Sequence, residues 1–382
     1  MSVLARLRGD LDLIPSPVES QPGLLIRDPM QYSDTILIIP PPLVPYLGLF
    51  DGEQPAPDGI EPLRDILSRS GFLDDDAGAQ LQNNARRQFA EAPLRLPAHM
   101  GSAYPEDLDE LRRQMNIWMG TVPRAQSSRQ LIGIAAPHVS PAGGYESYRA
   151  AYRLLTPEYK DRTFVVLGTS HYGPPDQFGI TRKPYVTPFG ATRTAGDLVS
   201  ELNPNEDYSH AVEHSIEFQV LFLQSIYGPD IEVLPILCGS YAHSIYFGGA
   251  PEGNDKVKRL LGTLGEMSAR EGDRLLWVLG IDLAHMGRRY GDEFVALADR
   301  DEMIRVAERD RIRMDRICEG DAAGFWNLVQ ENRDDLKWCG SAPIYTFMKA
   351  VPEARATLER YEQWNIDDQS VVSFAAMQLY KE

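Results

Sequence analysis

The sequence predicts an α/β protein with a central, mixed or mostly parallel sheet flanked by helices, preceded by a small N-terminal α+β unit. Three short apolar runs, each bounded by glycine or proline, predict the core of the sheet: 131–136, 163–167 and 275–279. Continuous apolar runs of about five residues are typical of buried parallel strands. Further strands are expected at 231–237 and 369–379, and helices at 145–155, 220–227, 255–268, 297–317 and 321–331. This alternation of strand and helix is typical of an α/β fold.

Each of the three apolar runs is followed by a histidine. His138 comes after the break at Pro137, His171 follows Gly168, and His285 follows Gly280 together with Asp282. In open α/β sheets, ligands bind beyond the carboxyl ends of the strands. We therefore expect a common site at one edge of the sheet, with the Gly- and Pro-rich segment 174–194 forming a hairpin over it.

The first 94 residues differ from the rest. Strand-like runs at 24–28 and 35–39 are followed by helix candidates at 43–50 and 60–72, which suggests a winged-helix-like unit. Residues 74–78 and a polar helix at 79–90 read as a connector, so the main domain is expected at 95–382. The segment 1–94 holds seven arginines, no lysine and fourteen acids, which is the wrong balance for binding phosphates. Docking of a peptide or protein partner is expected here, with a purely structural appendage as the alternative.

Composition limits the classes of function. The 382 residues carry a formal net charge of −17, which argues against general nucleic-acid binding. No run approaches the roughly 18 apolar residues of a membrane span, and the charged start lacks a signal-peptide core. Three cysteines are too few and too scattered for a disulfide framework. A cytoplasmic protein without a membrane partner is expected.

Five short motifs carry a resemblance to a known family. They are Ala136-Pro137-His138, Leu167-Gly168-Thr169-Ser170-His171, Glu213-His214-Ser215-Ile216-Glu217, Asp282-Leu283-Ala284-His285-Met286-Gly287 and Cys339-Gly340-Ser341-Ala342-Pro343-Ile344. In this order they resemble the Memo family, over roughly residues 95–382, and the segment 99–104 is similar to the start of that family. The resemblance implies a fold related to the class III extradiol (LigB-type) dioxygenases, which cleave catechol rings with non-haem iron. It also implies AMMECR1-like and radical-SAM proteins as partners, and segment 1–94 resembles small peptide-chaperone domains of radical-enzyme systems.

The resemblance also implies roles for individual residues. His138 and His171 match metal-ligand positions, and His214 matches the acid/base histidine of the dioxygenases. One departure is Ala284, which stands where animal Memo proteins carry a cysteine that joins the metal site. The glutamate that the dioxygenases use as a third ligand cannot be placed by motif, so Asp282, His285 or His214 are candidates for completing the set.

The residue types themselves support metal chemistry. Imidazole suits iron, zinc, copper or nickel, and two histidines with one carboxylate are typical of non-haem iron oxygen chemistry. The same ligands would suit zinc-dependent hydrolysis. Together with the resemblance, these residue types lead us to expect a metal set of His138, His171 and His214, with Fe²⁺, Cu or Zn as candidate ions, and His214, His285 and Asp282 as catalytic groups. The pocket is expected to include His99, Glu213, Tyr145 and Cys339.

Several of these residues also have structural interpretations. Asp282 is an ordinary helix N-cap candidate, His285 could be a satisfied buried histidine, and Cys339 could be a packed thiol. His210 and His243 have no motif support and are expected at the surface. Two functions stay open: a metal-dependent, dioxygenase-like oxidoreductase or hydrolase, and a non-catalytic partner- or peptide-binding protein.

Overall fold

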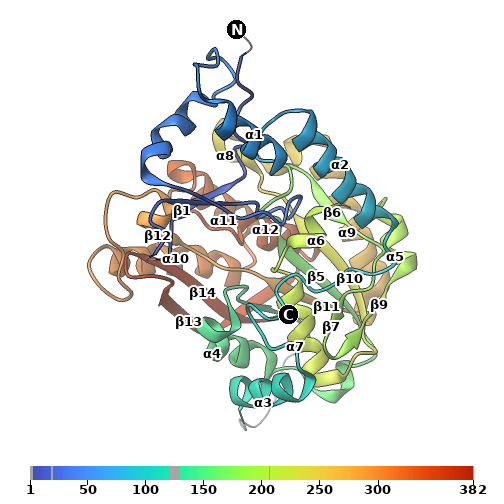
Figure 1. Ribbon diagram of the computed structural model, residues 1–382. Helices are drawn as coiled ribbons and strands as arrows, with labels where there is room; N and C mark the ends of the chain where they lie inside the picture. The colour runs from blue at the N-terminus through green and yellow to red at the C-terminus, as the bar shows by residue number, and fades with distance from the viewer. Residues whose placement is uncertain (1–2, 19, 121–129, 206, 382) are drawn as a thin grey trace. The chain divides into compact units, whose positions relative to one another are not determined.

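The computed structural model describes residues 3–18, 20–120, 130–205 and 207–381 (Figure 1). The chain forms two compact units, residues 1–92 and 93–382, and each is described by itself. None of the helices in the described ranges combines the length and the apolar character that crossing a membrane requires.

The N-terminal unit is a three-stranded antiparallel sheet followed by helices. Its elements are β1 (Asp12–Pro15), β2 (Leu24–Arg27), β3 (Leu37–Ile39), the 3₁₀ helix η1 (Pro41–Leu49), α1 (Glu61–Arg69) and α2 (Asp76–Glu91). The strands expected at 24–28 and 35–39 are confirmed, whereas β1 was not predicted. Apolar side chains from β2, β3, η1, α1 and the loops around them form one small core, which includes Ile26, Ile39, Leu67 and Phe72.

The main unit is built on one large mixed sheet. Its strands are β4 (Leu131–Ala136), β5 (Thr163–Thr169), β6 (Phe178–Ile180), β9 (Arg193–Thr194), β10 (Glu232–Cys238), β11 (Leu275–Gly280), β12 (His285–Gly287), β13 (Ala354–Asn365) and β14 (Ser370–Lys381). The strand order is β12-β14-β4-β11-β5-β10-β6, with β13 paired to β14 and β9 to β10. The four central strands β4, β11, β5 and β10 are parallel, while β14 runs antiparallel to β4 and β6 antiparallel to β10. The prediction of a central mixed sheet is confirmed.

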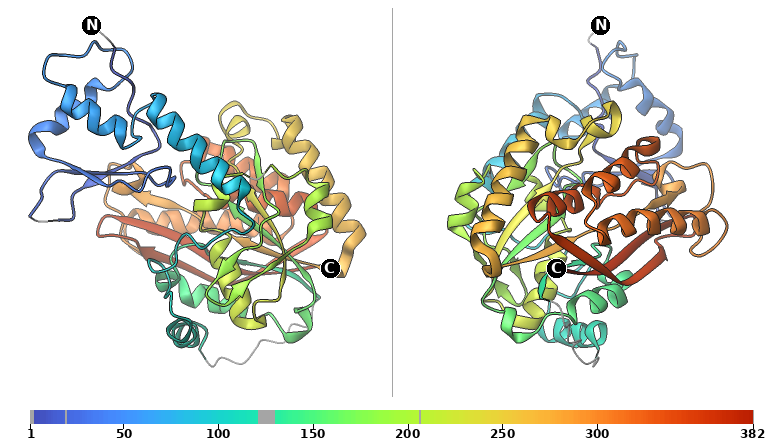
Figure 2. Two further views of the ribbon diagram at one scale, coloured as in Figure 1. Left: turned by 45° about the vertical axis from the view of Figure 1, so that its right-hand side comes forward. Right: turned by 180° about the vertical axis from the view of Figure 1, so that it is seen from behind.

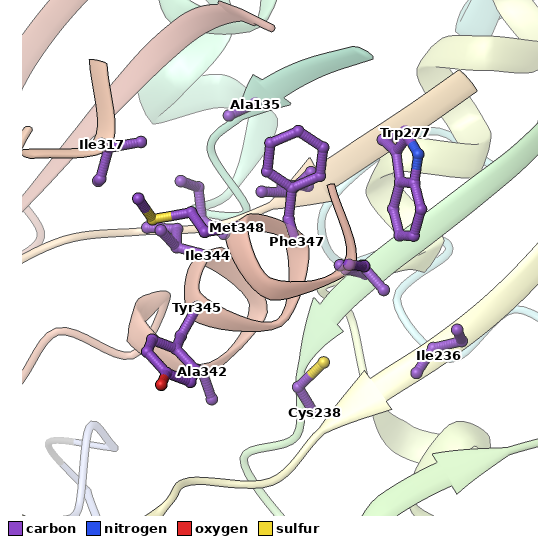
Figure 3. Close-up of a cluster of buried hydrophobic side chains, with 14 of the residues drawn as sticks. Ala135, Ile236, Cys238, Trp277, Ile317, Ala342, Ile344, Tyr345, Phe347 and Met348 are labelled. Carbon is purple, nitrogen blue, oxygen red and sulfur yellow. The ribbon is translucent and has the colours of Figure 1, made fainter. Parts of the chain in front are cut away.

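Helices cover both faces of this sheet (Figures 1 and 2). They are α3 (Leu108–Met119), α4 (Pro141–Tyr152), α5 (Gly196–Glu201), α6 (Ser209–Val212), α7 (Glu217–Tyr227), α8 (Ala242–Phe247), α9 (Asp255–Glu271), α10 (Glu302–Cys318), α11 (Ala322–Gln330) and α12 (Ser341–Ala350). The buried strands send alternate side chains to opposite faces. One core therefore forms under α3, α4 and α7, and the other under α9, α10, α11 and α12 (Figure 3).

The register of the central strands sets the position of the site. Gly280 at the end of β11 pairs with Ala136 of β4 on one side and with Gly168 of β5 on the other. Because the three strands are parallel, their carboxyl ends lie at the same level of one sheet edge. The chain that follows each strand, including His138 and His171, therefore leaves the sheet at that edge.

Several elements were not predicted from the sequence, among them β13 and α12. A hairpin does form within 174–194, between β7 (Val186–Thr187) and β8 (Gly190–Ala191). The hairpin was expected over the site, but it packs against the C-terminal half of α7, where the Thr187 hydroxyl donates a hydrogen bond to Gln224. His214 lies at the other end of this helix, before its first residue.

Candidate metal centre

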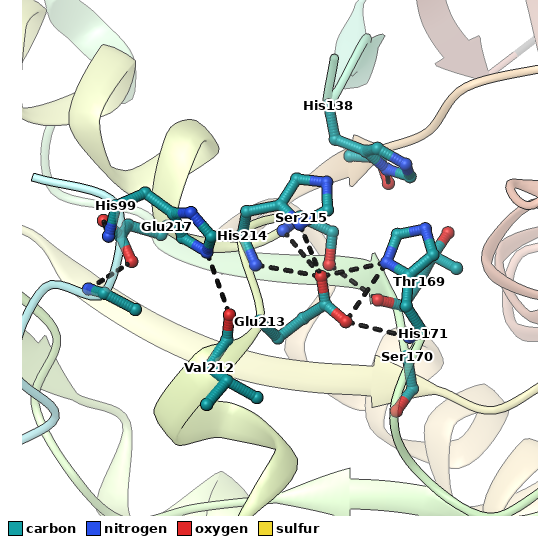
Figure 4. A network of polar contacts seen from close by, with 12 residues as sticks. His99, His138, Thr169, Ser170, His171, Val212, Glu213, His214, Ser215 and Glu217 are labelled. Atoms are coloured by element: carbon teal, nitrogen blue, oxygen red, sulfur yellow. Dashed lines mark hydrogen bonds and ion pairs between the residues drawn. The ribbon is translucent and has the colours of Figure 1, made fainter. Parts of the chain in front are cut away.

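Three histidines from three separate segments converge at the carboxyl edge of the sheet (Figure 4). One ring nitrogen from each of His138, His171 and His214 lies within 4.8 Å of the other two. The ring centroids of His138 are 5.0 Å from those of His171 and 5.2 Å from those of His214, and the His171 and His214 rings stack at 5.0 Å. The residues that the sequence placed in one metal set thus share one position in space.

The His138 ring is oriented by the end of β11. Its Nδ1 lies 2.9 Å from the carbonyl oxygen of Gly280. A carbonyl oxygen can only accept, so Nδ1 carries a proton, and Nε2 is the nitrogen left for a metal, which would displace a proton held there. The backbone N–H of His138 donates to Asp282 Oδ1 over 2.9 Å. His138 is 1% exposed, so its orientation is fixed by these contacts and by packing.

Glu213 orients the other two rings. Its Oε1 lies 3.0 Å from Nδ1 of His171 and 3.1 Å from Nδ1 of His214. The same carboxylate accepts the backbone N–H groups of His171, His214 and Ser215 at 2.8, 2.9 and 3.2 Å. A carboxylate on Nδ1 leaves Nε2 free to bind a metal, which is how proteins commonly orient ligating histidines.

Charges in this group are strongly coupled. Burial alone would raise the pKa of Glu213, but His171 and the hydrogen bonds from both histidines hold it well below its usual range. Burial opposes the charged form of His171, yet the Glu213 carboxylate raises its pKa well above the ordinary value. For His214, burial outweighs Glu213 and lowers the pKa to about 4. His214 is therefore neutral at pH 7.

The second charged pair joins His138 to Cys339. The Cys339 Sγ lies 3.2 Å from His138 Nε2, and Asp282 Oδ2 lies 3.5 Å from the same nitrogen. Burial disfavours the His138 cation, but Asp282 and Cys339 raise its pKa to about 9. Burial would raise the pKa of Cys339, but His138 and His285 lower it to about 5. The site therefore brings anionic and imidazole groups together at one point, which is an arrangement suited to binding a cation.

Two glycines allow the His214 segment to approach the strands. A Cβ on Gly168 would lie 2.5 Å from Ser215 Oγ, and a Cβ on Gly280 would lie 2.3 Å from the Ser215 carbonyl oxygen. Ser215 Oγ donates to the carbonyl of Thr169 over 2.7 Å, and Gln219 Nε2 donates to that of Pro137 over 2.8 Å. The loop before α7 is thus bound directly to the ends of β4 and β5.

A buried ion pair supports the loop from its other side. Arg95 bonds the carboxylate of Glu217 and donates to the carbonyl oxygens of His210 and Glu213, both over 2.7 Å. Glu217 also accepts the Tyr104 hydroxyl and the backbone N–H groups of residues 98 and 99. This network fixes the backbone that carries Glu213 and His214.

The other residues predicted for the site, which are His99, His285 and Tyr145, make different contacts. His99 contacts the His214 ring edge-on at 5.4 Å, and its Nε2 lies 2.9 Å from the Val212 carbonyl oxygen. His285 begins β12, its Nδ1 lies 2.9 Å from the Leu283 carbonyl oxygen, and its charge helps to lower the pKa of Cys339. Tyr145 lies on α4 beneath the Arg149 guanidinium and packs against the core of that face.

One surface prediction is wrong. His210 is buried, because the Tyr185 hydroxyl covers its Nδ1 at 2.7 Å and the residue lies inside the Arg95 network. His243 on α8 is exposed, as expected.

Sequence reasoning missed Tyr290. Its ring lies 5.0 Å from that of His285, and burial together with the charges of Asp282 and Cys339 raises its pKa. Arg95 and Gln219 were missed as well, although they position the loop. The only feature of the sequence that could have indicated them is a polar residue within an apolar stretch, which for Gln219 is the stretch that forms α7.

The donor set fits a transition metal. All three imidazoles present Nε2 with Nδ1 held by an acceptor, and a sulfur and a carboxylate oxygen lie close to His138 Nε2. Imidazole and thiolate are ligands for iron, copper, zinc and related ions, whereas magnesium and calcium prefer oxygen. The site also has an open side, because the His171 side chain is 28% exposed.

The fold and the site define an α/β protein with a candidate metal centre beyond the carboxyl ends of its central strands. The family model described as "Memo-like protein" matches residues 95–378, well over half of the chain. The chain belongs to the Memo family.

Curated relatives agree. A "MEMO1 family protein" of Aquifex aeolicus (strain VF5) is 25% identical over 383 residues, covering 93% of this chain and 96% of the relative. A "MEMO1 family protein" of Desulfurococcus amylolyticus is 27% identical over 312 residues, covering 75% of this chain and 99% of the relative. The Aquifex alignment thus extends beyond the part of the chain that the family model matches.

Proposed function

We propose that this Memo-family protein is a metal-dependent oxidoreductase whose ion is held by His138, His171 and His214. The observation that carries the proposal is the convergence of the three rings: each has Nδ1 against an acceptor, which leaves Nε2 as its ligand atom, and one ring nitrogen of each lies within 4.8 Å of the other two. A bound iron or copper ion would supply dioxygen or electron-transfer chemistry, as in the extradiol dioxygenases to which the resemblance relates this fold.

The residues around the ion have separate tasks in this proposal. Glu213 holds two of the rings, and the buried Asp282 fixes the His138 backbone through its N–H. His285 and Asp282 would exchange protons with a bound substrate. Substrate enters beside His171, the most exposed of the three histidines.

Metal analysis tests the proposal. Protein purified without chelator is expected to carry close to one equivalent of iron or copper, and His171→Ala is expected to lose most of it. His243→Ala, an exposed histidine on α8 outside the cluster, is the matched control and should keep it. Full metal content in His138→Ala and His171→Ala would refute the metal site.

Oxygen uptake separates chemistry from binding. The metal-loaded protein is given a simple catechol as a probe, and oxygen consumption is followed with an electrode. Uptake that depends on His171 supports an oxidoreductase. If the purified protein instead carries zinc and takes up no oxygen, a hydrolase is the better assignment, because a three-histidine site also suits zinc-dependent hydrolysis.

For residues 1–92 we propose a docking role toward AMMECR1-like or radical-SAM partners. Its support is that this compact unit lies outside the family match and has a core of its own. Capture of purified partner proteins by the full chain, compared with a chain lacking 1–92, tests the role. Equal capture by both would refute it.

A further inference from the structure

Cys339 lies at the histidine cluster without a role in the function proposed above. Its Sγ is 3.2 Å from His138 Nε2 and 3.6 Å from the Asp282 carbonyl oxygen. His138 is buried and its Nδ1 is already bound to Gly280, so Nε2 is directed at the sulfur. The thiol is therefore placed at the ring atom that would bind a metal.

The position of Cys339 is built into the fold. Gly340 donates its backbone N–H to the Asp282 carbonyl over 3.0 Å, and a Cβ at residue 340 would lie 2.6 Å from that same oxygen. Thr169 Oγ1 donates to the Cys339 carbonyl over 2.9 Å. The segment before α12 is thus tied to the chain after β11 and to the end of β5, the strand that leads to His171.

The distance between the two atoms suits two ligands of one ion. Metal bonds of 2.0–2.1 Å to imidazole and about 2.3 Å to thiolate, at angles between about 90° and 110°, separate the ligand atoms by about 3.1–3.6 Å. The observed 3.2 Å falls in this range. Asp282 Oδ2, at 3.5 Å from the same nitrogen, is the competing ligand.

Position 284 cannot supply a sulfur in this chain. Ala284 is fully buried, and its backbone N–H and C=O are bound to Ser373. A thiolate ligand from this part of the structure therefore has to come from Cys339. Cys238, by contrast, is buried in the core on the α12 face of the sheet, and Cys318 ends α10.

We propose that Cys339 is a thiolate ligand of the metal, bound together with His138, His171 and His214, and this rests on the metal site of the proposed function. A thiolate makes the site selective for ions such as iron, copper, cobalt and zinc over magnesium and manganese. Three histidines and one thiolate would still leave the exposed side near His171 open to substrate.

Cobalt(II) titration of the full chain, freed of metal by chelation, tests the proposal. Cobalt bound to a thiolate shows a sulfur-to-metal charge-transfer band in the near ultraviolet, and cobalt bound to imidazole and oxygen alone lacks it. The wild type is expected to show the band at one equivalent. Cys339→Ser should lose the band and bind cobalt at least about 10–100-fold more weakly, because removal of an outer-shell partner alone costs that much and a direct ligand should cost no less.

Controls assign the outcome. Cys318→Ser should keep the band, and circular dichroism of Cys339→Ser should match the wild type. Asp282→Asn should also keep the band. One equivalent of cobalt bound by the wild type without the band, or a band that persists in Cys339→Ser, would overturn the thiolate ligand and leave the histidine site standing. No cobalt binding by the wild type would instead overturn the metal site itself.

Discussion

Glu213→Gln tests whether one buried carboxylate orients His171 and His214 for the proposed metal binding. Glu213 is fully buried and accepts N–H groups from His171, His214 and Ser215 on both of its oxygens. A glutamine keeps the shape but offers one acceptor oxygen, so its NH₂ group must face at least one of these donors. Replacing an outer-shell partner of this kind costs about 10–100-fold in metal affinity, or about 1.4–2.8 kcal/mol.

The same change should also lower the free energy of unfolding. A buried donor left facing another donor costs about 1–3 kcal/mol. Isothermal titration with cobalt(II) measures the affinity, and guanidinium denaturation of the metal-free protein measures the stability. Glu266→Gln, an exposed residue of α9 outside the cluster, is the control and should change neither property by much. An affinity within twofold of the wild type, with binding abolished in His171→Ala, would show that Glu213 does not orient the ligands.

Three further predictions follow from particular contacts. Gly168→Ala should destabilise the fold by about 1–3 kcal/mol in chemical denaturation, because its Cβ would overlap the loop before α7; the exposed mid-helix Gly262→Ala, with open space around its Cβ, should stabilise by about 0.5–1 kcal/mol. Metal affinity should rise with pH by about tenfold per unit for each proton displaced, and flatten above the pKa of His138 at about 9; a flat profile from pH 6 to 9 would contradict the assigned protonation. Glu217→Ala should cost about 3–5 kcal/mol, because Arg95 then stays buried without its partner. Burial would raise the pKa of Glu217, but the charge of Arg95 lowers it below 4.5. In the wild type the ion pair therefore stabilises the fold fully above pH 4.5, and this stabilisation is lost as the pH falls further. Equal loss of stability in acid by Glu217→Ala and the wild type would refute this role of the ion pair.

The central strands could be predicted because burial on both faces makes them continuously apolar. β4, β5 and β11 each read as an uninterrupted apolar run, and all of their residues are buried. β13 was missed because its middle is half-exposed and carries Arg360 and Glu362. Its antiparallel pairing with β14, the strand that follows it after residues 366–369, makes it a strand, and its own residues show no apolar run that would indicate one.

The site was predictable in part for a related reason. His138 and His171 directly follow apolar strands, so the parallel topology alone brings them to one edge. The support given by Arg95 was invisible, because it comes from a residue more than 110 positions from its partners in the chain. His210 was misplaced at the surface because nothing in its neighbourhood reveals that Tyr185 and Arg95 enclose it.

The place of β14 in the sheet has a consequence for biosynthesis. β14 follows every other strand in the sequence, yet it pairs with β4, β12 and β13 and lies inside the sheet rather than at its rim. Its Ser373 also binds the backbone of the loop that carries Asp282. β14 must therefore be synthesised before this sheet can be completed, so β4 remains without its antiparallel neighbour until the residues up to Lys381 have been added.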